Sequence, residues 1–84
     1  MHAKLVGLRL PWPVCPEDQL CIEAEPDNEY DANALKVLVH LNGKWHMVGY
    51  VNREAAAELK DKTVSSVRAL IAGDGWTVPI NIEC

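Results

Sequence analysis

A phenol and a carboxylate are adjacent at Tyr30 and Asp31, within a run of polar, turn-forming residues from 25 to 33. A carboxylate accepts a hydrogen bond from a free sugar hydroxyl and repels phosphates, so this pair would favour the end of a nucleic acid strand over its middle. The structural alternative is that Tyr30 packs on the fold and Asp31 caps a turn. Both interpretations place the pair on a loop.

Arginine and aromatic side chains elsewhere in the chain could complete such a site. Base–aromatic stacking contributes roughly 1–3 kcal/mol per base and tolerates any sequence, and arginine contacts phosphates. The candidates are Arg9 and Arg53 for phosphate, with Trp12, Tyr50 and Trp76 for ring contact. The alternative for each tryptophan is packing in the core or under a lid, and for each arginine it is plain solvation. Trp45 follows a predicted hairpin turn and is expected in the core or at the rim of the fold.

The sequence contains no pattern typical of an enzyme. There is no Gly-x-Ser-x-Gly elbow, no glycine-rich phosphate loop and no histidine-rich metal spacing. His40 and His46 fall on predicted adjacent strands, but no nearby pattern completes a site with them, and we expect both to be solvated. We therefore predict a protein without catalytic residues or cofactors.

One stretch mimics the start of a calcium-binding loop through the spacing of Asp27, Glu29, Asp31 and Asn33. Two later positions fail the pattern. Ala32 stands where the loop needs glycine, and Leu38 stands where it needs a bidentate glutamate. We expect no metal, and we interpret Asp27 and Asn28 as residues that satisfy the backbone of a turn.

Length and composition predict one small globular domain over residues 1–84. A chain this short buries roughly 60–65% of its unfolded surface, and its 49% apolar content is too high for a disordered chain. No apolar run approaches the about 20 residues that span a membrane, and the N-terminus lacks the apolar region of a signal peptide. Cys15, Cys21 and Cys84 are an odd set without a Cys-x-x-Cys pair. We expect reduced thiols and an intracellular compartment, nuclear in a eukaryote and cytoplasmic in a bacterium.

The net charge of −4 is unevenly distributed. Seven acidic residues follow one another without an intervening Lys or Arg: Glu17, Asp18, Glu23, Glu25, Asp27, Glu29 and Asp31. A protein that coats duplex DNA is usually strongly basic, so this composition argues against that function. Contact with a few nucleotides is still compatible with a small positive face elsewhere.

Most of the chain alternates with period two, which is typical of strands with one buried face. The expected strands are 4–10, 20–25, 35–41, 45–50, 64–72 and 76–83, with a turn or 3₁₀ segment at 11–17. Asn42-Gly43 predicts a tight hairpin. Asn52 is suited to the N-cap of a helix through 55–60, and Pro79 suggests an edge strand or a bulge.

These elements predict a mainly β fold with one or two short helices, a small OB-like or Greek-key barrel of about six strands. The residues expected to line its core are Leu20, Ile22, Val37, Val39, Val48, Leu59, Leu70, Val78 and Ile80.

Three segments resemble the HIRAN domain family, a small β-barrel module that occurs attached to some chromatin-remodelling helicases and alone in bacteria and phages. They read EPDNEYDANALKV at 25–37, VGYVNRE at 48–54 and WTVPI at 76–80. The resemblance implies a module that captures a free 3′ end of single-stranded DNA, with Tyr30 and Asp31 facing the terminal nucleotide.

The resemblance also implies roles for other residues. Arg9, Arg53 and Trp76 match positions that contribute to the family's DNA pocket. Tyr50 stands where another member has histidine. That member has tyrosines close to its first arginine, whereas here Leu10 and Pro11 follow Arg9, and Trp12 is the candidate substitute.

We therefore expect a non-catalytic recognition module for the 3′-hydroxyl end of single-stranded DNA, with a protein partner or a fused helicase or nuclease domain as further candidates. The alternative is a protein-interaction module that uses an edge strand or the acidic face. Salt separates the two, because nucleic acid binding weakens as salt rises whereas strand addition is nearly salt-independent.

Overall fold

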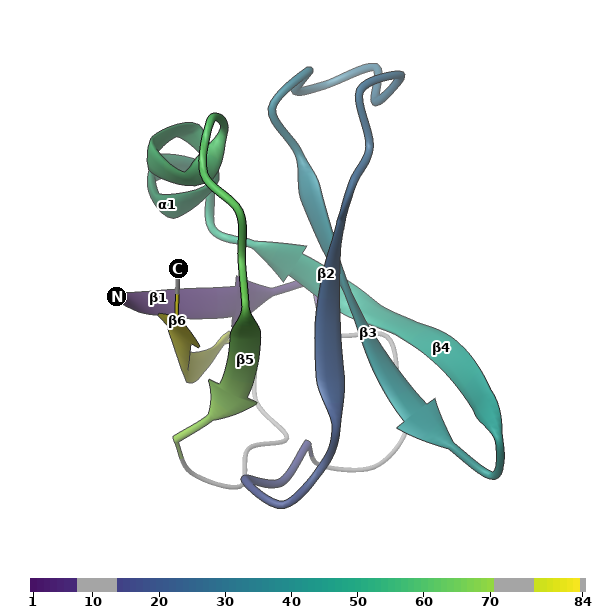
Figure 1. The fold of residues 1–84 in the computed structure, drawn as a ribbon. Coiled ribbons are helices and arrows are strands. Elements are labelled where there is room, and N and C mark those ends of the chain that lie inside the picture. The colour runs from purple at the N-terminus through teal and green to yellow at the C-terminus, as the bar shows by residue number, and fades with distance from the viewer. Residues whose placement is uncertain (8–13, 71–76, 84) are drawn as a thin grey trace.

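A computed structural model describes residues 1–7, 14–70 and 77–83. These residues form a six-stranded antiparallel sheet and one short helix (Figure 1). The elements are β1 (His2–Val6), β2 (Leu20–Ala24), β3 (Leu35–Leu41), β4 (Lys44–Val51), α1 (Arg53–Leu59), β5 (Ser66–Ala69) and β6 (Thr77–Glu83).

The sheet curls into a nearly closed barrel. Its strand order is β2-β3-β4-β1-β6-β5, and the two edge strands β2 and β5 contact each other across the remaining seam (Figure 1). This arrangement confirms the predicted small, mainly β barrel of about six strands with a short helix. No helix in the described ranges is long and apolar enough to cross a bilayer.

The interior of the barrel is lined by the apolar phase of each strand. Of the predicted core residues, seven are buried: Leu20, Val37, Val39, Val48, Leu59, Val78 and Ile80. Ile22 packs partly buried against this core. The prediction for Leu70 is wrong, because β5 buries Val67 and Ala69 and the alternation leaves Leu70 40% exposed just beyond the strand.

The hairpin between β3 and β4 turns as predicted, since Asn42 and Gly43 have φ angles of 53° and 79°. The ladder contains a bulge that the alternation did not predict. Leu38 pairs with Met47 but Val37 pairs with Gly49, so one residue of β4 is extra. A bulge resets the alternation of the strand that carries it.

Gly49 stands where β1 approaches β4 most closely. A Cβ atom at this position would clash with the carbonyl oxygen of Val6 and lie 3.1 Å from Leu5 Cδ1. Glycine is therefore required at position 49 for the close packing of β1 against β4, which explains why glycine precedes Tyr50 in the VGYVNRE segment.

Helix α1 begins after Asn52 as predicted, but the Asn52 side chain makes no capping hydrogen bond. Asn52 Oδ1 instead accepts a hydrogen bond from the Lys4 N–H at 2.8 Å, while the Asn52 N–H donates to the Lys4 carbonyl at 2.8 Å. Asn52 thus extends the pairing of β1 beyond β4. Glu54 follows in the first turn, where its own backbone N–H and the Asn52 amide lower the pKa of the carboxyl group.

The expectation that Pro79 marks an edge or a bulge is wrong, because β6 lies between β1 and β5. Pro79 pairs with Lys4, whose N–H and C=O are both directed to Asn52. That position of the ladder therefore needs no donor from proline. On its other side, the Pro79 carbonyl accepts from the Leu70 N–H at 3.0 Å, where β5 has ended.

Two smaller expectations are also resolved in part. The first strand is shorter and earlier than predicted, and residues 8–10 of that prediction lie outside the described residues. The described part of the segment 11–17 forms a turn as predicted. The Asp18 carboxylate stabilises this turn by accepting a hydrogen bond from the Cys15 N–H at 2.8 Å. Neither Cys15 nor Cys21 forms a disulfide bond within the described residues, and Cys84 lies outside them.

Candidate functional site

The loop from Glu25 to Ala34, between β2 and β3, is shaped by its own side chains. Asn28 Oδ1 accepts hydrogen bonds from the backbone N–H groups of Tyr30 and Asp31, at 2.8 and 3.0 Å. Asp31 Oδ1 accepts from the Asn33 N–H at 2.9 Å. Short polar side chains therefore replace a regular ladder here, and the prediction that Asn28 is a turn residue is confirmed.

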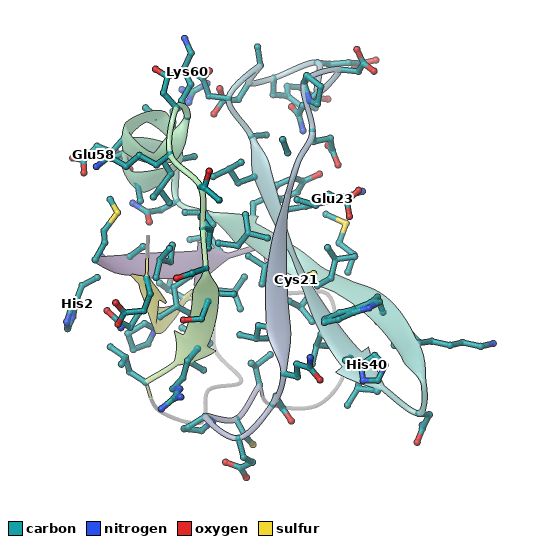
Figure 2. The ribbon with its side chains drawn as sticks, viewed as in Figure 1. His2, Cys21, Glu23, His40, Glu58 and Lys60 are labelled. Atoms are coloured by element: carbon teal, nitrogen blue, oxygen red, sulfur yellow. The ribbon has the colours of Figure 1, made fainter. Side chains whose placement is uncertain are left out.

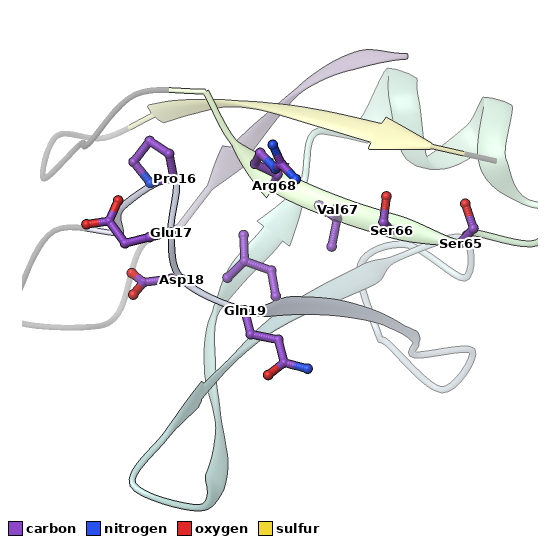
Figure 3. Close-up of a pocket in the computed structure, with 9 residues that line it drawn as sticks. Pro16, Glu17, Asp18, Gln19, Ser65, Ser66, Val67 and Arg68 are labelled. Atoms are coloured by element: carbon purple, nitrogen blue, oxygen red, sulfur yellow. The ribbon is translucent and has the colours of Figure 1, made fainter.

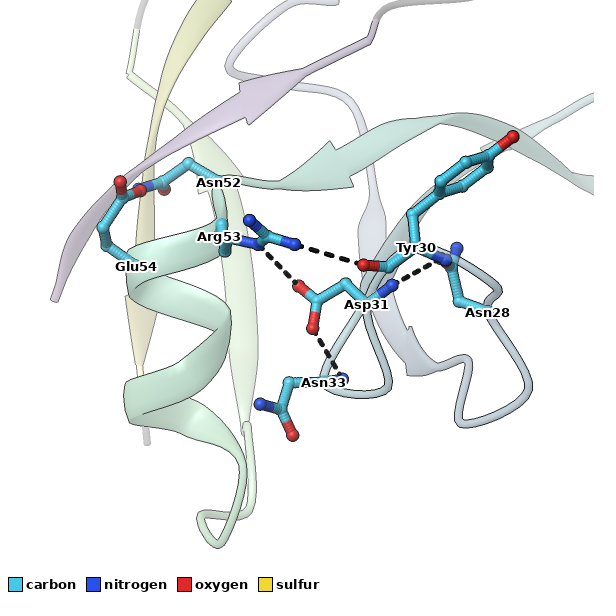
Figure 4. A network of polar contacts seen from close by, with 7 residues as sticks. All are labelled: Asn28, Tyr30, Asp31, Asn33, Asn52, Arg53 and Glu54. Carbon is cyan, nitrogen blue, oxygen red and sulfur yellow. Dashed lines mark hydrogen bonds and ion pairs between the residues drawn. The ribbon is translucent and has the colours of Figure 1, made fainter.

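Arg53 joins the start of α1 to this loop (Figure 4). Its Nη2 donates to the Tyr30 carbonyl at 3.1 Å, and its Nε lies 3.6 Å from Asp31 Oδ2. The Arg53 side chain is 74% exposed and that of Asp31 is 23% exposed. The ion pair is therefore worth little for stability, but it fixes where the guanidinium and the carboxylate stand.

Glu25 ties the loop to the end of β4. Its Oε1 accepts hydrogen bonds from Asn28 Nδ2 at 2.8 Å and from the Tyr50 hydroxyl at 2.9 Å. Sequence reasoning counted Glu25 only as part of the acidic run. Because Tyr50 is 25 residues away, no local pattern connects the two, and only the fold reveals the contact.

These segments surround a hollow of about 300 Å³, which we call the loop pocket. Its lining is mainly apolar and consists of Val6, Asn28, Tyr30, Asp31, Ala34, Tyr50, Val51 and Arg53. Four predicted site residues therefore meet at one place: Tyr30, Asp31, Tyr50 and Arg53. The other three, Arg9, Trp12 and Trp76, lie outside the described residues.

Tyr30 is 85% exposed, so the alternative in which it packs on the barrel is wrong. Asp31 does cap a turn, yet only one of its oxygens is used for that purpose. The arrangement offers an open aromatic ring, a carboxylate and a guanidinium around an apolar hollow. Such a combination of apolar lining and a few oriented polar groups is typical of ligand sites.

A larger hollow of about 560 Å³ lies at the seam between β2 and β5, and we call it the seam pocket (Figure 3). Its lining is mainly polar and consists of Pro16, Glu17, Asp18, Gln19, Leu20, Ser65, Ser66, Val67 and Arg68. None of the predicted site residues that the structure describes belongs to it. Next to it, partial burial and the charges of Glu17 and Asp18 raise the pKa of the Cys15 thiol.

The histidines and Trp45 lie on the β3–β4 hairpin. His40, labelled in Figure 2, and His46 are both exposed, as predicted. The ring centroids of His40 and Trp45 are 4.9 Å apart with a tilt of 53°. Trp45 is 45% exposed at the outer end of the hairpin, so it is a rim residue and not a core residue. Within the described ranges, no three His, Cys, Asp or Glu residues are grouped so as to hold a metal ion.

Comparison with known proteins identifies relatives for this arrangement. The sequence profile of the HIRAN domain family matches residues 2–67. The chain is 32% identical over 87 residues to the helicase-like transcription factor of Mus musculus, covering 95% of the chain and 8% of that protein. For the helicase-like transcription factor of Oryctolagus cuniculus, the identity is 30% over 89 residues, covering 98% and 9%. The chain thus spans less than a tenth of the length of these relatives.

Among solved structures, the crystal structure of the HIRAN domain of human HLTF is similar, with a TM-score of 0.64 and 24% identity. The match covers 98% of this chain and 71% of the chain in that structure. It shows that the two share their fold.

Proposed function

The chain belongs to the HIRAN domain family, and on that premise we propose that it is a non-catalytic module that binds single-stranded DNA at a free 3′-hydroxyl end. One observation carries the proposal. Tyr30 and Asp31 from a loop, Tyr50 from β4 and Arg53 from α1 line a single pocket although they are dispersed in the sequence.

Asp31 supplies the means to select a hydroxyl end. One of its oxygens accepts from the Asn33 N–H and the other faces Arg53, and an ionised carboxylate has about four lone-pair sites. It can therefore still accept a hydrogen bond from a terminal 3′-hydroxyl. A 3′-phosphate at the same place would meet a like charge at short range.

Tyr30 and Arg53 supply binding that does not depend on the terminal group. The exposed ring of Tyr30 suits base stacking. Arg53 uses Nη2 and Nε within the protein, and its remaining donors are available to a backbone phosphate. Arg9, Trp12 and Trp76 remain part of the proposed site as phosphate and ring contacts.

The length of the matched relatives bears on the kind of protein in which this module acts. Its matched relatives carry names that describe them as helicase-like and are more than ten times longer than the matched part. We propose that residues 1–84 act as one intracellular recognition module, without catalytic residues of their own, that serves a helicase or nuclease domain.

The test is a fluorescence anisotropy titration of the purified chain with single-stranded oligonucleotides that differ only in a 3′-hydroxyl or a 3′-phosphate. We expect tighter binding of the hydroxyl end and weaker binding as salt rises. Equal affinity for the two ends would remove end recognition from the proposal. Absence of binding at low salt would refute DNA as the ligand.

A protein-interaction module is the second candidate, and the seam favours it. Both edges of the sheet, β2 and β5, border the seam pocket, where Glu17 and Asp18 give an acidic rim. Edge strands accept an added strand through main-chain hydrogen bonds, which depend little on salt. Salt-independent capture of an extended peptide, lost on proline substitution in β5, would support this candidate.

A further inference from the structure

A mainly apolar strip lies on the outer surface of the β3–β4 hairpin and of the adjacent strand β2, and we call it the hairpin face. It consists of Cys21, Leu38, His40, Trp45 and Met47. Cross-strand pairing brings them together, because Leu38 pairs with both Cys21 and Met47, and His40 pairs with Trp45. Their neighbours Val37 and Val39 point into the core, so these side chains are directed outward.

The bulge in β4 makes this face continuous with the loop pocket. Trp45 and Tyr50 are five residues apart, and strict alternation would place them on opposite faces of the sheet. The extra residue between Met47 and Gly49 resets the alternation, so that Tyr50 pairs with the outward-facing Lys36. Tyr50 therefore lines the loop pocket at one end of the same face that carries Trp45 at the other.

We propose that the DNA strand whose 3′ end occupies the loop pocket continues along the hairpin face, where Trp45 stacks on a base further from the end. This inference rests on the proposed function and extends it to a second contact. The partners of Tyr50 and Trp45 on β3 are Lys36 and His40, which are four residues apart, so the two residues are separated by about 13 Å along the strand. Folds of the OB type cover about 4–16 nucleotides of single strand, so a path of this length fits one barrel.

The chemistry of the face favours a nucleic acid base over a charged partner. Trp45 is 45% exposed. Its indole ring contacts the imidazole ring of His40 on the neighbouring strand. Two acidic residues lie beside this path. Glu23 is paired with Lys36 at 3.7 Å, and Glu25 accepts hydrogen bonds from Tyr50 and Asn28. The face thus presents rings and thioether without net charge, which suits sequence-tolerant stacking. Continuity with the loop pocket selects single-stranded DNA as the occupant.

The test measures how affinity depends on strand length. Wild type and Trp45→Ala are titrated by anisotropy with 3′-hydroxyl oligothymidines of about 2 to 12 nucleotides, within the range that one such fold can cover. We expect the two proteins to bind the shortest strands equally. For strands long enough to reach Trp45, the variant should bind about 5- to 10-fold more weakly, at the low end of the stacking contribution. Its salt dependence should equal that of wild type, because no phosphate contact is lost.

Two further variants serve as controls. Trp45→Phe keeps a ring and should recover most of the loss with long strands. Leu70→Ala removes another exposed large apolar side chain, at the end of β5 and off the hairpin face, and should not change binding at any length. Unchanged thermal unfolding of Trp45→Ala would show that the fold is intact.

The outcomes separate this inference from the proposed function. Equal binding of wild type and Trp45→Ala at every length would overturn the extended path and leave end recognition standing. The same loss for short and long strands would also overturn it. If wild type binds no strand, both proposals fail. A wild-type dimer that Trp45→Ala dissociates would assign the face to a second copy of the chain and would likewise overturn the DNA path.

Discussion

The loop pocket and the seam pocket differ in how they are built, although both are open to solvent. The seam pocket is the larger, at about 560 Å³ against about 300 Å³, and its lining is mainly polar. The loop pocket is mainly apolar, and its polar groups are held by contacts within the protein, such as Asn28 to the loop backbone and Arg53 to Asp31.

This difference shows why volume alone is a poor guide to function. The seam pocket lies where the two edge strands β2 and β5 leave the barrel incompletely closed. An apolar hollow with oriented polar groups must be constructed, here by a loop network and by the close approach at Gly49. Internal hydrogen bonds also hold Asp18 and Ser65 in the seam pocket, so the apolar lining is what distinguishes the loop pocket. An apolar lining with a few oriented polar groups is typical of ligand sites, so function is expected at the loop pocket.

The largest expected effect comes from the packing beneath the loop pocket. Gly49→Ala should destabilise the fold by about 3 kcal/mol, because the added methyl group meets the Val6 carbonyl. DNA binding should be lost with it, and urea unfolding measures the change in stability. Ser66→Ala at the exposed seam should change the free energy of unfolding by less than about 0.5 kcal/mol. Equal stability of the two variants would contradict the inference that the loop pocket depends on close packing and the seam pocket does not.

The next effect concerns stacking in the loop pocket. Tyr30→Ala should weaken the binding of single-stranded DNA by about 5- to 160-fold, as expected for loss of about 1–3 kcal/mol of stacking. Hydroxyl and phosphate ends should be affected alike, and thermal unfolding should be unchanged because the ring is exposed. Gln19→Ala in the seam pocket is the matched surface control. A similar loss of DNA affinity in this variant would indicate that DNA binds at the seam pocket and not at the loop pocket.

Charge gives a smaller but diagnostic effect. Arg53→Ala should weaken binding to all sequences and reduce the slope of affinity against salt by about one charge. Arg68→Ala removes an equal charge from the seam pocket and should leave the slope unchanged. Arg53→Lys keeps the charge and should keep the slope. Identical slopes for wild type and Arg53→Ala would exclude a phosphate contact by Arg53, and the same experiment on Arg9→Ala tests that residue.

End preference is expected to change by a few fold only. Asp31→Ala should abolish the preference for a 3′-hydroxyl over a 3′-phosphate, because both the acceptor and the repulsion are removed. Asp31→Asn keeps an acceptor oxygen for the Asn33 N–H but removes the negative charge. This variant therefore distinguishes the role of Asp31 in the turn from its role in recognising the terminal group. Phosphorylated ends should bind both variants better than wild type, and competition titration detects this. An unchanged preference for the 3′-hydroxyl end in Asp31→Ala would show that Asp31 only stabilises the turn.

The smallest effect reports the electrostatics of the seam. Because partial burial, Glu17 and Asp18 raise the pKa of Cys15, its thiolate fraction is low at neutral pH, and alkylation by iodoacetamide should be slow there. Glu17→Gln should shift the pH dependence of the alkylation rate to lower pH, as followed by mass spectrometry. An unshifted profile would show that the negative field does not reach Cys15 and would weaken the contrast between the pockets.

Local signals predicted most of the barrel correctly. Val37 and Val39 are buried because period-two alternation directly encodes a one-sided strand, and Asn42-Gly43 adopts the positive φ angles that a tight hairpin needs. The prediction for Leu70 failed because alternation does not fix its own phase in a short strand. β5 is four residues long, and the pairing with β6 decides which residues face inward.

The residues that line the loop pocket were predicted only where a motif or a turn residue marked them. Tyr30, Asp31, Tyr50 and Arg53 were named because their segments resemble a family, and the structure brings them together. Glu25 was missed, since its contact with Tyr50 depends on tertiary structure. Asn52 is the N-cap residue of α1 as predicted, but for the same reason the sequence did not reveal that its side chain makes no capping hydrogen bond. A cap is a local preference, and the nearby backbone of Lys4 offers the side chain a different partner.

The strand order has a consequence for when this protein can fold. β1 lies between β4 and β6, and His2 pairs with Asn81. Of the strands of this domain, β1 is synthesised before the others, and it is paired on both sides only after β6 has been synthesised. Contacts this distant along the chain slow folding, and an unpaired strand is exposed to aggregation in the meantime. Because Val6 lines the loop pocket and pairs with Thr77 of β6, the loop pocket is complete only after β6 has been synthesised.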